Sequence, residues 1–200
     1  MNYLGHLLLS GNNNELMMAN LYGDFFKGSH YESLPGIIEE GVHLHRDIDS
    51  YIDHHPITRA VLKPLYDLLP KVAPIALDLF FDHLLAKNWS QYHVQPLNKF
   101  VADFFEYALK PENQIFVEKN FAYPKEFIEL LQIIHSSKWL TRYQELEGLE
   151  FACKGLSQRI NFDNNLHEGP TIFTENESLI AVSFHQYMKE AMERFGIQNN

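Results

Sequence analysis

The stretch that decides the fold class is IALDLFFDHLLAKNW, residues 75–89. Pro74 suits the first turn of a helix, where a backbone N–H would have no partner anyway, and we expect this helix to reach about Lys87. Leucine and phenylalanine occur on nearly every side of its turns. A helix that is apolar on most of its surface belongs in a protein core, so the rest of the chain must pack around it.

The hydrophobic spacing of the remaining chain is also helical, and no Asn-Gly or Asp-Gly hairpin sequence occurs. We therefore predict an all-α, bundle-like fold with one compact domain over residues 1–200. Thr174 and Glu177 match a capping box, which predicts the start of a last helix with Leu179 and Val182 facing inward. The expected helices are 14–27 (capped by Asn14), 37–55, 57–69 (kinked or shortened by Pro64), 74–87, 96–108, 125–137, 139–159 and 174–195, with 161–173 as a loop.

Composition and charge exclude several classes of protein. The chain has 46% hydrophobic residues, enough for a substantial core, and a formal net charge of −10. This charge argues against nucleic acid as a partner, because neutralising phosphates needs a basic surface. A single cysteine excludes a disulfide framework and a cysteine-based zinc cluster. No apolar run reaches the roughly 20 residues of a membrane-spanning helix, and the first residues do not resemble a signal peptide. We therefore expect a cytoplasmic protein without a membrane partner.

Histidine and aspartate recur in apolar surroundings in four segments of the first 90 residues. In GVHLHRDIDSYIDHHP, residues 41–56, the side chains of His45, Asp49 and Asp53 are spaced by four and share one helix face. Burying such groups costs free energy unless they are paired or bind a metal. Imidazole and carboxylate ligands without cysteine suit Mn²⁺, Fe²⁺ or Mg²⁺, and phosphoester hydrolysis is the natural reaction of such ions. The candidates are His6, Asp24, His45, Asp49, Asp53, Asp78, Asp82 and His83.

Structural interpretations of the same residues stay open. His6 alone can be a core imidazole that is bonded to a carbonyl group. Asp78, Asp82 and His83 can form a buried polar network that ties helices together. Arg46 can simply neutralise a neighbouring acid. The functional interpretation is favoured because one helical domain rarely needs polar networks in four separate segments.

Six motifs together resemble the bacterial acyl carrier protein phosphodiesterases, also called ACP hydrolases. They are MNYLGHLLLS (1–10), NLYGDFFKG (20–28), GVHLHRDIDSYIDHHP (41–56), APIALDLFFDHLLAKNWSQ (73–91), WLTRY (139–143) and GLSQR (155–159). The resemblance implies an all-helical, HD-domain-like phosphohydrolase with rearranged motif order, which uses Mn²⁺; the donor set also leaves Mg²⁺ or Fe²⁺ possible. The reaction that it implies removes the 4′-phosphopantetheine group from holo acyl carrier protein and leaves the apo protein.

The resemblance also implies the site residues. The positions that match the metal-site motifs of the family are His6, Asp24, His45, Asp49, Asp82 and His83. The dyad reads Asp82-His83, the reverse of the usual His-Asp order, so we do not assign individual ligands by analogy with ordinary HD enzymes. Asp53 and Asp78 match motif acids of less definite role. The expected catalytic residues are Arg46, Asp49, Asp82 and His83.

A carrier-protein substrate would need a basic patch, because acyl carrier proteins are themselves strongly acidic and this chain is negatively charged. The candidates for docking are Lys27, Arg59 and Lys63. Two alternatives remain. One is an HD-type phosphohydrolase that acts on a small molecule or a nucleotide, and the other is a non-catalytic carrier-protein binder with a structural metal.

Overall fold

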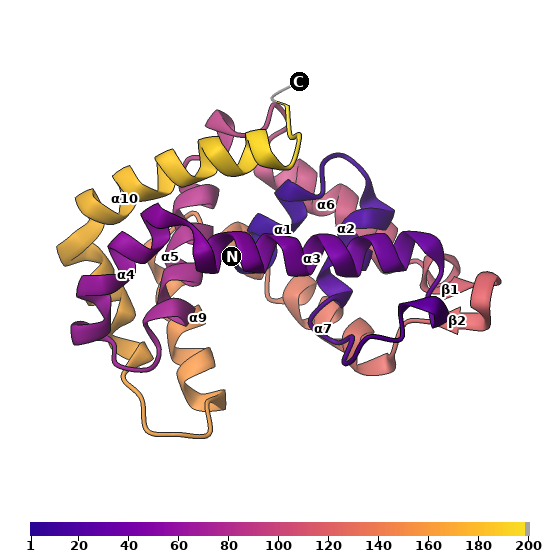
Figure 1. The fold of residues 1–200 in the computed structure, drawn as a ribbon, viewed down its shortest axis with the longest axis horizontal. Helices are drawn as coiled ribbons and strands as arrows, with labels where there is room; N and C mark the ends of the chain where they lie inside the picture. The colour runs from indigo at the N-terminus through magenta and orange to yellow at the C-terminus, as the bar shows by residue number, and fades with distance from the viewer. Residues whose placement is uncertain (199–200) are drawn as a thin grey trace.

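Helix α5 (Ala73–Lys87) is buried along most of its length in the structure, a computed structural model that describes residues 1–198. The side chains of Phe80 and Phe81 have no exposed surface, which confirms the prediction that this helix is buried. In Figure 1, α4, α5 and α9 lie in one half of the molecule and α10 runs along its edge. The helices that contact α5 are α1 (Tyr3–Leu9), α4 (Pro56–Leu68), α9 (Leu146–Arg159) and α10 (Gly169–Arg194).

The long helix α3 (Gly36–His54) crosses from this half to the other one (Figure 1). The described residues form ten α-helices and one two-stranded antiparallel sheet, so the prediction of a single compact all-α domain is confirmed. The short hairpin, which was not predicted, pairs Ile115 with Ala122. The elements of the other half are α2 (Asn14–Tyr22), α6 (Leu97–Ala108), β1 (Ile115–Phe116), β2 (Phe121–Ala122), α7 (Lys125–Ser136) and α8 (Trp139–Arg142).

Two glycines allow α2 to pack closely against α3. A Cβ atom on Gly41 would lie 2.3 Å from Cβ of Ala19 and 2.5 Å from its backbone carbonyl carbon, so α3 has room for no side chain there. A Cβ atom on Gly23, at the end of α2, would lie 2.3 Å from Cγ of the His45 ring. The close packing therefore sets the position of His45 relative to α2 and the loop that follows it.

Helix α1 is not among the predicted elements, because its start depends partly on a distant residue. The side chain of Asn2 accepts a hydrogen bond from the first helical N–H group. The carboxylate of Asp82 on α5 accepts two more, from the N–H groups of Leu4 and Gly5 at 2.8 and 3.2 Å. Free N–H groups at a helix start need such acceptors, so α5 helps to cap α1.

Helix α2 differs from the prediction at both ends. Its N-cap is Asn13, whose side chain accepts hydrogen bonds from the following turn, and Asn14 is the first helical residue. The helix ends at Tyr22 rather than near residue 27. Helix α4, by contrast, runs through Pro64 to Leu68, so this proline does not shorten the helix.

The prediction of one helix over residues 139–159 is wrong, because the chain turns sharply within this range. Helix α8 ends at Arg142 and α9 begins at Leu146. A Cβ atom on Gly148 would lie 1.9 Å from the carbonyl oxygen of Arg142. The chain therefore folds back tightly on itself between the two helices.

The last helix begins before the predicted capping box. Helix α10 has Pro170 in its first turn, so part of the expected loop is helical. The Thr174 hydroxyl donates a hydrogen bond to the carbonyl oxygen of Pro170 at 2.9 Å and does not cap a helix. Leu179 and Val182 are 51% and 67% exposed, so the prediction that they face inward is also wrong.

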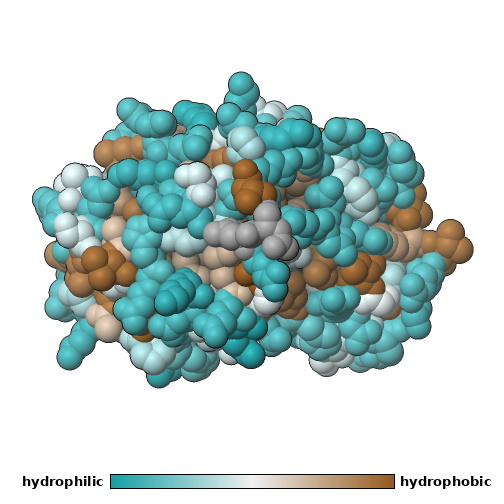
Figure 2. All heavy atoms as spheres, turned by 90° about the horizontal axis from the view of Figure 1, so that it is seen from above, coloured by the Kyte–Doolittle hydropathy of each residue, from teal (hydrophilic) through white to brown (hydrophobic). Residues whose placement is uncertain are grey.

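The surface that is seen from above is mainly hydrophilic, with small hydrophobic patches between the polar side chains (Figure 2). Val117, which follows β1, is 98% exposed. None of the helices in residues 1–198 has both the length and the apolar character needed to span a membrane.

We expect Gly41→Ala to destabilise the protein, because a methyl group has no room between α2 and α3. Overpacking of this kind costs about 1–3 kcal/mol. The matched control is Gly155→Ala in α9, where a Cβ atom meets no atom within 4 Å and alanine should add up to about 1 kcal/mol. Denaturant unfolding followed by circular dichroism measures both changes. A Gly41→Ala variant as stable as the wild type would contradict the close packing.

Candidate functional site

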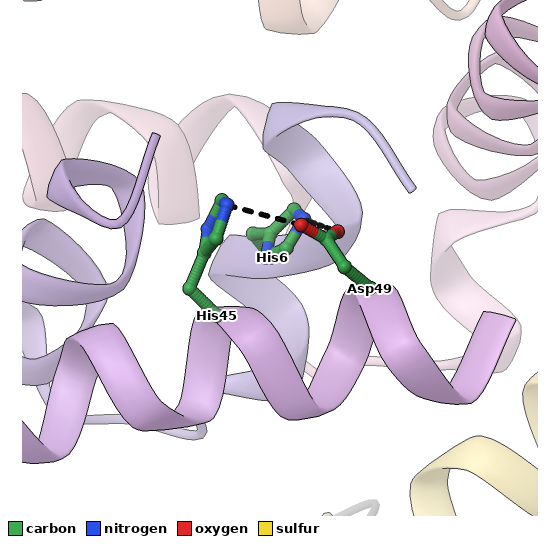
Figure 3. Close-up of side chains that lie close together, drawn as sticks. All are labelled: His6, His45 and Asp49. Atoms are coloured by element: carbon green, nitrogen blue, oxygen red, sulfur yellow. Dashed lines mark ion pairs between the residues drawn. The ribbon is translucent and has the colours of Figure 1, made fainter. Parts of the chain in front are cut away.

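Three side chains from two helices meet at the centre of the candidate site (Figure 3). His6 lies on α1, and His45 and Asp49 lie one turn apart on α3. Asp49 Oδ1 is 3.2 Å from Nε2 of His6, and Asp49 Oδ2 is 3.2 Å from Nε2 of His45. Each residue offers one ligand atom, and these atoms lie within 4.8 Å of one another, close enough for a single metal ion.

Asp24 brings the set to four side chains. It lies in the loop after α2, and its Oδ1 is 3.3 Å from Nε2 of His45. The residues His6 and His45 are buried, whereas the side chains of Asp24 and Asp49 are 58% and 46% exposed. The imidazoles are thus inside and the carboxylates face solvent. We call His6, Asp24, His45 and Asp49 the acid–histidine cluster.

The two imidazole rings are stacked, with centroids 4.3 Å apart. Nδ1 of His6 and Nδ1 of His45 both point to one atom, Oδ1 of Asn20 on α2, at 2.9 and 3.2 Å. Nε2 of each ring points to carboxylate oxygens of the cluster. All four ring nitrogens therefore face oxygen atoms.

Burial and ion pairing act in opposite directions on the cluster. Burial lowers the pKa of His6, although its contact with Asp49 works the other way. Burial also disfavours a charged His45, yet its hydrogen bonds with Asp24 and Asp49 raise the pKa of His45 to about 9. Loss of water around Asp24 and Asp49 favours their neutral forms, but the imidazoles hold the pKa of both carboxyl groups below the usual range. The two carboxylates are therefore ionised and favour positive charge beside them.

The cluster lines a cavity of about 380 Å³. Asp53 and Asp78 add two more acids to its wall, and Tyr3 and Trp139 add aromatic surface. Arg159 of α9 is the one lysine or arginine among the described residues that line it. The wall therefore offers acids and imidazoles to a cation, one guanidinium to an anionic group, and aromatic rings to the organic part of a ligand.

Asp82 and His83 do not join the cluster. The side chain of Asp82 is fully buried and accepts hydrogen bonds from two N–H groups in the first turn of α1. Nδ1 of His83 lies 2.7 Å from the carbonyl oxygen of Tyr143. These contacts match the structural interpretation, in which a buried polar network ties helices together.

The two other predicted side chains divide between the cavity and the surface. Asp78 lies on the cavity wall, and its Oδ1 is 3.0 Å from the amino nitrogen of Met1. Arg46 instead donates hydrogen bonds to the carbonyl oxygens of Phe26 and Gly28 at 3.3 and 2.9 Å. Its guanidinium also lies over the ring of Phe26. Arg46 therefore supports the loop after α2, and it makes none of the acid contacts that the sequence suggested.

The predicted docking residues lie on the surface, and two of them contact segments that line the cavity. Lys27 Nζ donates to the carbonyl oxygen of Asp24 at 2.8 Å. Arg59 Nε donates to the carbonyl oxygen of Asp53 at 3.3 Å. Lys63, one turn further along α4, is exposed. Because Asp24 and Asp53 line the cavity, Lys27 and Arg59 lie at its edge.

Comparisons with known proteins identify the family. The family model described as acyl carrier protein phosphodiesterase matches residues 1–191. The chain belongs to this family. It is 33% identical over 160 residues to proteins named acyl carrier protein phosphodiesterase from Shigella boydii serotype 18, Escherichia coli K12 / DH10B and Escherichia coli O157:H7, which covers 80% of this chain and 79% of each relative. No solved structure gives a significant match, so the relation to HD domains stays a prediction.

The family name indicates a phosphodiesterase, and two residues at its candidate site escaped the sequence analysis. Asn20 and Arg159 both lie inside motifs that carry the family resemblance, and this was the only signal that could have found them. The side chain of Asn20 is uncharged, so it does not stand out in a search for acids and histidines in apolar segments. Arg159 lies more than a hundred residues after the last member of the acid–histidine cluster in the sequence, so its place in the cavity depends on tertiary packing.

We expect the stability of this phosphodiesterase to depend on the ionisation of Asp82. Burial raises the pKa of its carboxyl group from 3.8 to about 7, so the folded chain holds a proton there that the unfolded chain releases. The resulting stabilisation is complete below pH 3.8 and is lost as the pH rises through about 7. Asp82→Asn cannot ionise, so the free energy of unfolding of the wild type should fall relative to this variant between about pH 4 and pH 7.

Urea unfolding of the wild type and Asp82→Asn at several pH values measures this difference. Asp103→Asn is a suitable control, because the Asp103 carboxylate pairs with Lys99 and its pKa is lowered by that contact. The difference in the free energy of unfolding between Asp103→Asn and the wild type should stay constant above about pH 5. A pH-independent difference for Asp82→Asn would contradict the raised pKa.

Proposed function

We propose that this chain removes the 4′-phosphopantetheine group from holo acyl carrier protein by metal-dependent hydrolysis of its phosphodiester. The products would be apo acyl carrier protein and free 4′-phosphopantetheine. The observation that carries the proposal is that all four ring nitrogens of His6 and His45 face oxygen atoms beside a cavity. Membership of the family supplies the identity of the substrate.

A count of protons supports a divalent cation in the cluster. The contacts with Asp24 and Asp49 keep His45 protonated, so the two rings carry three N–H groups in total, yet four ring nitrogens face oxygen acceptors. One lone pair would then point at oxygen, which is repulsive. A divalent cation bound by Nε2 of His6 and Nε2 of His45 would remove this repulsion and leave both Nδ1–H groups to donate to Asn20. Its charge would also balance the carboxylates of Asp24 and Asp49.

The four side chains of the acid–histidine cluster are the proposed ligands. Two imidazoles and two carboxylates without a thiolate fit Mn²⁺, with Mg²⁺ and Fe²⁺ as alternatives. Held by these residues, such an ion would supply an activated water for hydrolysis, because a divalent cation lowers the pKa of bound water toward neutrality. Asp82 and His83 would support the site without ligating the ion, because their contacts lie elsewhere.

Other residues of the cavity wall would bind and orient the substrate. The Arg159 guanidinium would bind the non-bridging phosphate oxygens, for which its planar fork is well suited, and would take the role first assigned to Arg46. Burial raises the pKa of the Asp78 carboxyl group, and the amino group of Met1, 3.0 Å away, opposes this shift. The pair of Asp78 and the Met1 amino group would hold a proton on the cavity wall and pass it to the serine oxygen of the carrier protein as the P–O bond breaks.

The direct test is incubation with holo acyl carrier protein and Mn²⁺, followed by mass spectrometry of the carrier protein. We expect it to lose the mass of the phosphopantetheine group, and EDTA to stop the reaction. His45→Ala should lower turnover more than about 100-fold, because loss of an outer partner of a metal ligand alone costs about 10–100-fold. Nucleotide hydrolysis without any change in holo acyl carrier protein would overturn the proposal in favour of the small-molecule alternative. Binding without turnover would favour the non-catalytic one.

Two arginine variants in the same assay locate the phosphate. Arg159→Ala should lower kcat by about 100-fold, as loss of one group that stabilises transition-state charge does. Arg46→Ala is the matched control, since its guanidinium is occupied by the carbonyl groups of the loop after α2. A larger loss in Arg46→Ala than in Arg159→Ala would place the phosphate beside that loop.

We expect the double change Arg59→Glu with Lys63→Glu to raise KM for holo acyl carrier protein several-fold at low ionic strength. Cations at the edge of a binding site act mainly on the rate of association, and salt screens their effect. We therefore expect kcat to change little. Hydrolysis of a small phosphodiester should be unaffected. The matched control is Lys110→Glu, just after α6, with Lys125→Glu at the start of α7, in the other half of the molecule (Figure 1). An unaltered KM for the first variant, or an equal rise in both, would contradict docking on α4.

A further inference from the structure

The side chain of Asn20 joins both imidazoles of the acid–histidine cluster and is fully buried. Its Oδ1 lies 2.9 Å from Nδ1 of His6 and 3.2 Å from Nδ1 of His45. Its Nδ2 lies 2.8 Å from the hydroxyl oxygen of Ser10 and 3.3 Å from the carbonyl oxygen of His6. One amide group therefore links α1, α2 and α3.

These contacts determine which way the amide faces. The Ser10 hydroxyl donates its single proton to the carbonyl oxygen of His6 at 2.8 Å, so it can only accept a hydrogen bond from Asn20. The His6 carbonyl oxygen is also only an acceptor. The NH₂ group must therefore face Ser10 and the carbonyl, and the amide oxygen must face the two rings. That oxygen can only accept hydrogen bonds from ring N–H groups.

We infer that Asn20 is a positioning residue that keeps the protons of both imidazoles on Nδ1. With its proton on Nδ1, each neutral ring directs the lone pair of Nε2 at the carboxylates of the cluster, where one cation can bind both rings. The other tautomer would place a ring lone pair against the amide oxygen and a proton where the cation binds. This inference rests on the metal dependence proposed above.

A shared acceptor also sets the angle between the rings. The planes of the His6 and His45 rings are inclined by 19°, and both rings come within 3.2 Å of Asp49. Two separate acceptors would not couple the rings in this way. Removing the one acceptor should therefore disturb both ligands together.

The first test is a titration of the metal-free protein with Mn²⁺, with the free ion measured by electron paramagnetic resonance. Asn20→Leu has a similar volume and no acceptor, and we expect its Kd for Mn²⁺ to rise about 10–100-fold. Asn20→Asp keeps an oxygen toward both rings and should bind Mn²⁺ more tightly than Asn20→Leu. Ser10→Ala is the matched control, because it removes a partner of the amide but leaves the oxygen toward the rings. Its Kd should stay within about threefold of the wild type.

The second test follows the ring protons, which a merely structural role would not change. Zn²⁺ is a diamagnetic substitute that binds both imidazole nitrogen and carboxylate oxygen. In the Zn²⁺-loaded wild type, nuclear magnetic resonance should show a slowly exchanging Nδ1–H proton on His6 and on His45. Both signals should exchange faster in Asn20→Leu and persist in Ser10→Ala. Thermal unfolding by circular dichroism reports separately on the fold of each variant.

The outcomes separate the inference from the proposed function. A wild type that binds neither Mn²⁺ nor Zn²⁺ would overturn the proposed metal dependence and the inference with it. Wild-type binding that is unchanged in a folded Asn20→Leu variant, with both Nδ1–H signals retained, would overturn the inference alone. If Asn20→Leu does not fold, Asn20→Asp decides, because loss of both ring signals in a folded Asn20→Asp protein would contradict the inference and their retention would support it.

Discussion

The close approach of α2 to α3 is the constraint on which the candidate site depends. Gly41 brings the two helix backbones into contact, and Gly23 leaves room for the ring of His45. This packing brings Asn20 and Asp24 within hydrogen-bond distance of that ring. A larger residue at either glycine would separate the imidazole from both of its partners. The geometry of the site is therefore set by backbone packing before any ligand contributes to it.

The second imidazole, that of His6, depends on the buried carboxyl group of Asp82 on α5. A helix as short as α1 is only marginally stable by itself, and Asp82 accepts hydrogen bonds from its first turn. Burial disfavours the charged form of this carboxyl group and so raises its pKa to about 7. The arrangement is tolerated because it fixes His6 beside α3. Asp82 thus acts on the candidate site through the position of α1.

Local sequence patterns were sufficient to predict the helical fold and the core of the site. The four-residue spacing of His45 and Asp49 placed them on one helix face, and the apolar sequence of α5 predicted its burial. Local patterns could not predict α1, because its capping carboxylate comes from α5. They also missed the break between α8 and α9, which depends on the contact of Gly148 with Arg142. The contacts of Asn20 likewise exist only where three helices meet.

The central claim is that His6 and His45 bind one divalent cation through Nε2, beside Asp24 and Asp49. Electron spin-echo spectroscopy of the Mn²⁺-loaded protein tests it most directly, because it detects imidazole nitrogens that are bonded to the ion. The account predicts two such nitrogens in the wild type and one in either His6→Ala or His45→Ala. A spectrum without imidazole nitrogen, or one that is unchanged in both variants, would contradict it.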